Sequence, residues 1–324
     1  MIKLIPAHSP VHAVALLALM ACQALRAAGS DAVPQATAPP AATPVHGMWI
    51  WRSSTVLQAP QAPLAIRNFC AGEGINEIYV TISRHYGALE ALQLGELIGQ
   101  MHQAGIRVEA LISSTDADEP GAPRTHLIDQ VQSVLQFNHE HWAARFDGVH
   151  LDVEPQQRDE YKGADDIGYL PGLIDTYRAV RRLTDRAGIS LNADVPPRLL
   201  RAQLLQRRAL LSAVPRLTLL LYDTDSTREV AATELARLRE SSGQLLASAY
   251  AGLDGGQLAR MLIGLRSADY GAQLPQMLAA LDQTYSADPH YLGWARQSYN
   301  DILADGAPGG ASSGTSRAPF APSP

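Results

Sequence analysis

The chain has 324 residues, of which 46% are hydrophobic and 18% are charged, as is ordinary for a globular protein. This length accommodates either two small domains or one large α/β barrel. The formal net charge is −6 and no cluster of Lys and Arg stands out, which disfavours nucleic-acid or anionic-membrane binding as the main activity.

The chain begins with a segment typical of an export signal. A weakly basic start is followed by an apolar run from Val11 to Leu25 and then by small residues. The run is short for a membrane span. We therefore expect residues 1–28 to be an export signal, and the mature protein to act in the periplasm or outside the cell.

Two processing routes are open for this signal. The run Leu19-Met-Ala-Cys22 resembles a bacterial lipoprotein box, in which Cys22 would be lipidated and would anchor the protein to a membrane. On either route Cys70 is left without a thiol partner, so the mature domain has no internal disulfide. Its stability must then come from a hydrophobic core, which a domain of this size can bury.

Composition divides the rest of the chain into three parts. Residues 29–45 are rich in Ala and Pro and nearly uncharged, as in an extended linker. Residues 305–324 are mostly Gly, Ala, Ser and Pro, which predicts disorder. Between them, residues 46–304 form one expected domain.

Within this domain, short apolar runs alternate with longer amphipathic stretches. The expected strands are Met48–Arg52, Glu77–Ser83, Arg107–Ser113, Gly148–Glu154, Ser190–Val195, Leu217–Asp223, Leu245–Tyr250 and Leu292–Arg296. The expected helices include Leu92–Ala104, Leu127–Ala144, Leu170–Ala187, Val230–Arg239 and Gln257–Leu281. Strands that recur every ~30 to 40 residues with helices between them predict a (β/α)8 TIM barrel.

A doubly wound open sheet is the main alternative architecture. No Gly-rich phosphate-binding fingerprint follows the first expected strand, which argues against it. Only Asn300–Ala304 precedes the tail, so we expect the eighth helix of the barrel to be short or missing.

The fourth expected strand carries the most informative residues. In an alternating strand His150, Asp152 and Glu154 share one face, while apolar residues occupy the other. Burying two carboxylates and an imidazole is costly, so a strand that keeps them usually places them for chemistry. Pro155 ends the strand, which places Glu154 at the C-terminal rim, where barrel active sites lie.

Glu154 is the strongest catalytic candidate, as a general acid whose pKa is raised by burial and by a like charge. Asp152 lies close enough to stabilise a positive centre beside that acid. Each also has a structural interpretation: Glu154 as the partner of an Arg or a loop cap, and Asp152 as the partner of His150. His150 alone is more typical of a satisfied core histidine, and its expected task is to hold Asp152 ionised and oriented.

The run from Asp147 to Glu154 resembles the DxxDxDxE strand of the family 18 glycoside hydrolases, the chitinase-like group. Three other runs are similar in register to the family's third-strand serine motif, its sixth-strand Met-x-Tyr-Asp motif and its seventh-strand Tyr-Gly turn. They are Leu111-Ile-Ser-Ser114, Leu221-Tyr-Asp223 and Ala249-Tyr-Ala-Gly252. The resemblance runs across most of the domain, although only the fourth-strand motif is specific.

This resemblance implies a role for each matching residue. Glu154 would protonate the glycosidic oxygen, and Asp152 would orient a substrate N-acetyl group that acts as the internal nucleophile. Tyr222 would hold the acetyl oxygen, and Asp223 would bind sugar hydroxyls. Tyr222 and Asp223 also fit a structural role, as a rim hydroxyl and a helix cap.

The chain departs from the family pattern at three places. His150 stands where the family has an Asp, Thr115-Asp116 replaces glycines after the third-strand serines, and Val153 replaces an aromatic residue. The histidine alters the charge balance on which substrate-assisted chemistry depends. These departures suggest a distant relative that acts on another polysaccharide or has lost catalysis.

Further residues at expected strand ends are candidates for sugar binding. Flat indoles can stack on pyranose rings, and core-capping tryptophans are equally common. The candidates for contacts with the substrate are Trp51, Arg52, Arg84, Asp116, Asp194, Tyr250 and Trp294.

The leading hypothesis is an exported, monomeric glycoside hydrolase that needs no cofactor and acts on a polysaccharide or oligosaccharide. One alternative is a catalytically inactive barrel that binds a cell-envelope polysaccharide. Another is a metal hydrolase with His150, Asp152 and Glu154 as ligands. No second cluster with ligand spacing supports a metal, since His139 and His141 face different sides of an expected helix.

Overall fold

The computed structural model describes residues 43–59, 61–84, 86–161, 167–221, 242–244, 246–253 and 257–301. The expected export signal, Cys22, most of the Ala/Pro-rich linker and the expected C-terminal tail lie outside these residues. The expected helix Val230–Arg239 also lies outside them.

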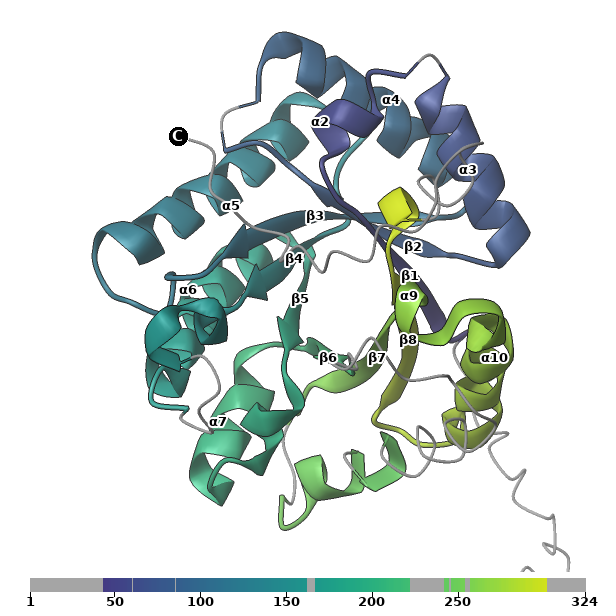
Figure 1. Ribbon diagram of the computed structural model, residues 1–324. Helices are drawn as coiled ribbons and strands as arrows, with labels where there is room; N and C mark the ends of the chain where they lie inside the picture. The colour runs from purple at the N-terminus through teal and green to yellow at the C-terminus, as the bar shows by residue number, and fades with distance from the viewer. Residues whose placement is uncertain are drawn as a thin grey trace, which may run out of the picture. The chain divides into compact units, whose positions relative to one another are not determined.

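Eight parallel strands form a closed barrel in chain order, each paired with its neighbours and β8 paired with β1 (Figure 1). The strands are β1 (Val45–Ile50), β2 (Glu77–Thr81), β3 (Arg107–Ser114), β4 (Gly148–Val153), β5 (Ser190–Val195), β6 (Arg216–Leu220), β7 (Arg260–Arg266) and β8 (Tyr291–Gln297). The predicted (β/α)8 barrel is confirmed, and the open doubly wound sheet is excluded because the sheet closes.

The described helices surround the barrel in Figure 1. They are α2 (Ser53–Val56), α3 (Ala62–Glu73), α4 (Ala88–Gln103), α5 (Ala122–Glu140), α6 (Leu170–Ala187), α7 (Leu204–Ala213), α9 (Ser267–Tyr270) and α10 (Leu274–Tyr285), with 3-10 turns at Pro155–Gln157, Asp159–Tyr161, Pro197–Arg201 and Gly271–Gln273. Over the part of the chain described, no helix has the length and apolarity needed to cross a membrane.

The prediction of the seventh strand is wrong. Residues 246–250, inside the expected strand Leu245–Tyr250, are helical, and β7 instead begins at Arg260. The expected helix Gln257–Leu281 is therefore divided between β7, α9 and the first turns of α10. The other seven expected strands are present, with ends that differ by a few residues.

Apolar side chains fill two separate regions. The larger cluster lies between sheet and helices and includes the outward-facing Val149, Leu151 and Val153 of β4. The smaller one contains Trp49, Tyr79, Leu111, Leu220, Leu262 and Ala295. The side chains of β4 alternate between the two faces of the strand, as the sequence predicts.

A buried ion network lies at the first residues of the strands, at the N-terminal end of the barrel. Arg216 of β6 donates to Glu109 of β3 at 2.9 Å and to Glu77 of β2 at 3.0 Å, and both acids are fully buried. Burial acts to raise the pKa of Glu109, but the Arg216 charge and bonds from His150 and Ser190 outweigh it and lower the pKa to about 2.

Candidate active site

Three polar side chains of β4 lie along the interior of the barrel, in the order of the chain. His150 is fully buried and packs against interior aromatic rings, with its ring centre 3.9 Å from that of Tyr79. Asp152 is 5% exposed, and Glu154 follows the strand at its C-terminal rim. Positions 150, 152 and 154 therefore lead from the middle of the barrel to the rim, with an ionisable group at each.

Glu154 is held by the backbone and by two amides of the turn that follows β4. Its backbone N–H donates to Ser114 O at 2.8 Å, and its carboxylate accepts from Gln156 Nε2 at 3.0 Å and from the amide of Gln157. Burial and the charge of Asp194 raise its pKa to about 7 despite these two bonds. A carboxyl group in this state can deliver a proton near neutral pH.

Asp152 lies one layer below Glu154. The hydroxyl of Ser113 on β3 donates to Asp152 Oδ2 at 3.3 Å. Burial, followed by the charges of Glu154 and Asp194, raises the pKa of Asp152 well above its usual range. Asp152 and Glu154 therefore titrate as an interacting pair.

Asp194 of β5 is a buried carboxyl group next to this pair, and it is the partner of His150. Its Oδ1 lies 2.7 Å from Nε2 of His150, and its Oδ2 accepts a bond from Trp49 Nε1 at 3.2 Å. The predicted contact of His150 is therefore corrected, because the ring is bonded to Asp194 and not to Asp152. The two β-strands are paired, which brings together residues 44 positions apart in the chain.

Burial acts to lower the pKa of His150, but its carboxylate neighbours prevail. Asp194 and then Glu109 raise this pKa to about 9, so the ring is an imidazolium at neutral pH. Glu109 Oε2 lies 3.5 Å from Nδ1, on the side of the ring away from Asp194.

The other predicted residues of the rim are dispersed. Trp51 is half-buried beside the smaller apolar cluster, and its backbone N–H donates to Asn300 Oδ1 at 2.8 Å. Arg52 and Arg84 are exposed. Asp116 is exposed after β3, where it accepts a bond from Ser114 Oγ at 2.9 Å.

Two predicted sugar contacts lie away from the rim. Trp294 of β8 stacks on His46 and donates from Nε1 to Asp282 of α10 at 3.1 Å, so it faces a helix. Tyr250 is helical, stacks on the ring of His290 just before β8 and donates to the carbonyl of Ala259 just before β7. Placing these two residues at the C-terminal rim is wrong. Tyr222 and Asp223 lie outside the described residues.

Four residues near the carboxyl groups were not predicted. Trp49 binds Asp194, the amides of Gln156 and Gln157 bind Glu154, and the charge of Arg266 acts on Glu154. The alternation of Trp49 with Trp51 on the first strand was a usable signal. Arg266 ends β7, and the wrong assignment of that strand concealed it.

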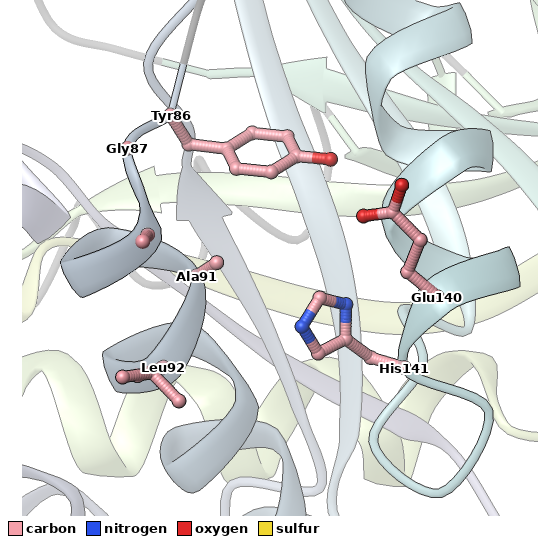
Figure 2. Close-up of a pocket in the computed structure, with 7 residues that line it drawn as sticks. Tyr86, Gly87, Ala91, Leu92, Glu140 and His141 are labelled. Atoms are coloured by element: carbon pink, nitrogen blue, oxygen red, sulfur yellow. The ribbon is translucent and has the colours of Figure 1, made fainter.

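A separate groove of about 380 Å³ lies outside the barrel, between the start of α4 and the end of α5. Figure 2 shows Tyr86 and Leu92 on one side of it and Glu140 and His141 on the other. None of Asp152, Glu154 and Asp194 lines it. Among the residues that the structure describes, no three His, Cys, Asp or Glu side chains are grouped as ligands of a metal ion.

No family model matches this sequence, and no curated protein matches it. Solved structures with a similar fold include a chitinase from Chromobacterium violaceum ATCC 12472, with 15% identity, a TM-score of 0.44, and coverage of 69% of this chain and 68% of that one. The spore cortex-lytic enzyme SleL of Bacillus cereus has 12% identity, a TM-score of 0.46, and coverage of 69% and 50%.

A chitinase from Bacteroides thetaiotaomicron has 11% identity, a TM-score of 0.47, and coverage of 80% of this chain and 92% of that one. The chain spans half of SleL and about two thirds of the Chromobacterium enzyme. At these identities the likeness concerns the fold, and the chemistry has to be argued from the residues of the site.

Proposed function

We propose that this protein is a glycoside hydrolase in which Glu154 is the general acid and Asp152 the stabilising carboxyl group. The observation that carries the proposal is the pairing of buried Asp152 with half-buried Glu154 toward the C-terminal rim of a (β/α)8 barrel, with the pKa of Glu154 raised to about 7. Cleavage of a glycosidic bond requires such an acid beside a group that stabilises positive charge.

In this mechanism Glu154 gives its proton to the glycosidic oxygen as the bond to the anomeric carbon breaks. The sugar left behind develops positive charge, which the newly formed carboxylate of Glu154 and the oxygens of Asp152 stabilise. Because Asp152 and Glu154 interact, the loss of a proton from one of them raises the pKa of the other.

The substrate we propose is a polysaccharide or oligosaccharide that bears N-acetyl groups. The support is the resemblance of residues 147–154 to the strand that the chitinase-like enzymes use. On such a substrate the acetamido oxygen would attack the anomeric carbon, with Asp152 orienting the acetamido N–H. Water, giving a proton back to the Glu154 carboxylate, would then open the cyclic intermediate, so the configuration at that carbon would be retained.

Release of reducing ends from a panel of polysaccharides tests the proposal. The panel contains chitin, peptidoglycan and acetylated exopolysaccharides, incubated with residues 43–324 and with the Glu154→Gln variant. Glu96→Gln, on the exposed face of α4, is the matched control. We expect the parent and the control to hydrolyse one polymer and the Glu154 variant to lose activity by at least ~10²-fold. Equal activity of parent and Glu154 variant would contradict the proposal.

A second function is favoured by one observation, the histidine at position 150 in a motif that otherwise has an aspartate. In that case the barrel binds a cell-envelope polysaccharide without cleaving it. Pull-down with the same insoluble polymers distinguishes the two functions. Retained binding with no release of reducing ends would establish the binding barrel.

We also propose that the protein acts outside the cytoplasm, on the basis of the signal-like composition of residues 1–28. Cell fractionation of the full chain and of the Cys22→Ser variant tests this. If the protein is a lipoprotein, the parent will be in the membrane fraction and the Cys22→Ser variant will be in a different fraction. If it is a cleaved soluble protein, parent and variant will be in the same fraction. Cytoplasmic retention of both proteins would contradict export.

A further inference from the structure

Asp194 is bonded on both of its carboxylate oxygens inside the barrel. The ring of His150 occupies Oδ1 at 2.7 Å, the indole N–H of Trp49 occupies Oδ2 at 3.2 Å, and the side chain is almost fully buried. Both donors place partial positive charge against its oxygens, which favours negative charge at this position.

The His150 ring, which is the cation beside Asp194, also has partners at its second nitrogen. Nδ1 of His150 faces Glu109 Oε2 at 3.5 Å and the side-chain amide of Asn192 at 3.1 Å. Asn192 also bonds to Thr218 Oγ1 at 3.2 Å, and a hydroxyl can donate or accept. The amide can accordingly turn its oxygen to a protonated Nδ1 and its NH2 to Thr218, so the surroundings accept an imidazolium.

The same carboxylate lies beside Asp152 on the neighbouring strand. Leu151 pairs with Ala193 between β4 and β5, so the next residue on each strand, Asp152 and Asp194, points into the barrel. Asp194 therefore presents its charge to Asp152 and Glu154 from the neighbouring strand.

Building on the proposed function, we propose that Asp194 is a positioning residue for the general acid. His150 and Trp49 fix its two oxygens in place, and its negative charge keeps the transferable proton on Glu154. A histidine on β4 and an aspartate on β5 thus act together as one fixed ion pair beneath the acid.

The groups that face Glu154 come from four elements and the turn after β4. They are Asp152 on β4, Asp194 on β5, Arg266 on β7, Tyr177 on α6, and the amides of Gln156 and Gln157. Arg266 and the two amides act to lower the pKa of Glu154, whereas burial and Asp194 raise it. Removing the Asp194 charge should therefore shift the balance toward an ionised Glu154.

The test follows the carboxyl carbon of Glu154 directly, by NMR of protein labelled with ¹³C at the Glu and Asp carboxyl groups. The Glu154→Gln variant identifies the Glu154 signal. Asp175→Asn, at an exposed position of α6, is the control for Asp194→Asn. We expect Asp194→Asn to lower the titration midpoint of Glu154 by at least about one pH unit, with no change in the control.

His150→Gln provides a second variant, which removes the cation and leaves Asp194 intact. Without the imidazole, Asp194 loses the bond that fixes its Oδ1, so the Glu154 midpoint should move from its value in the parent protein. The double variant should shift it no further than Asp194→Asn alone, because His150 acts through Asp194. A structural role alone would leave the midpoint where it is in the parent protein.

A Glu154 midpoint that stays in place in folded Asp194→Asn protein overturns the inference. This measurement needs no substrate, so it separates the two proposals. If the midpoint falls but no polysaccharide is cleaved by the parent, Asp194 controls the proton on Glu154 and the glycosidase proposal fails. If the parent cleaves a polymer and the midpoint does not move, the glycosidase proposal stands and the inference about Asp194 fails.

Discussion

At the scale of single residues, the ionisation of Glu154 controls the proposed activity. The pKa of this side chain is raised to about 7 by burial and by Asp194, and only its protonated form can donate. We expect kcat/KM to be constant below the midpoint and to fall tenfold per pH unit above it. Initial rates measured from pH 5 to 9 on a cleaved polymer test this, and a rate that still rises at pH 9 would contradict it.

The same groups predict how stability changes with pH. The pKa of His150 rises from 6.5 to about 9 on folding, and that of Glu154 from 4.5 to about 7. A group whose pKa is raised stabilises the fold below its unfolded pKa and loses that contribution as pH rises through its folded pKa. Because of these two groups, the free energy of unfolding should fall as the pH rises from about 4.5 to about 9.

Urea denaturation at several pH values measures this dependence. Glu154→Gln should flatten the fall between about pH 4.5 and 7, since it removes one of the two groups, and should leave the fall up to pH 9 that belongs to His150. Identical curves for parent and variant would show that Glu154 is not buried as a neutral acid.

The residues that the sequence could predict were those carried by one strand. His150, Asp152 and Glu154 follow from alternation alone, because a strand places every second side chain on the same face. The partner of His150 could not be predicted, since Asp194 meets it only through the pairing of β4 with β5. Trp294 was misplaced for a related reason. A shift of one residue along a strand turns a side chain to the other face of the sheet, and Trp294 faces α10.

At the scale of elements, the seventh strand shows where hydrophobic patterns fail. The run Leu245–Tyr250 and the true β7, Arg260–Arg266, are both short and apolar, and such runs do not distinguish a strand from a buried helix. The longer amphipathic pattern of α6 had no such ambiguity, and Leu170–Ala187 was predicted with its observed ends.

Gly148 provides a test of how closely β4 packs at its start. A Cβ there would lie 2.8 Å from Glu109 Oε1 and 2.9 Å from the Ser190 carbonyl oxygen, closer than either contact tolerates. We expect Gly148→Ala to destabilise the fold by ~1 to 3 kcal/mol. Gly95→Ala within α4 meets no atom within 4 Å and should stabilise by ~0.5 to 1 kcal/mol.

Urea unfolding of the two glycine variants makes the comparison. Circular dichroism first confirms that each has the parent's secondary structure. If Gly148→Ala is as stable as the parent, β4 and β5 are farther apart at this position than the structure indicates.

At the scale of the whole molecule, ionisable groups run along the barrel from one end to the other. The network of Arg216, Glu77 and Glu109 is followed by His150, then by Asp194 and Asp152, and finally by Glu154 at the rim. The recurrence of strands and helices was enough to predict the barrel. The network of Arg216, Glu77 and Glu109 was not predictable, because these residues come from β6, β2 and β3 and meet only when the sheet closes.

The guanidinium of Arg216 holds these three strands together at the N-terminal end. Replacing it with Met leaves Glu77 and Glu109 buried without their cation, so we expect the free energy of unfolding to fall by ~3 to 5 kcal/mol at pH 7. Arg107→Met is the matched control, because Arg107 also pairs with Glu77 but is 46% exposed, and its loss should be below ~1 kcal/mol. Adding Glu77→Gln to Arg216→Met should restore part of the stability by removing one unpaired charge. Equal losses for the two arginine variants in urea would mean that water reaches the network, and the barrel end would then be open.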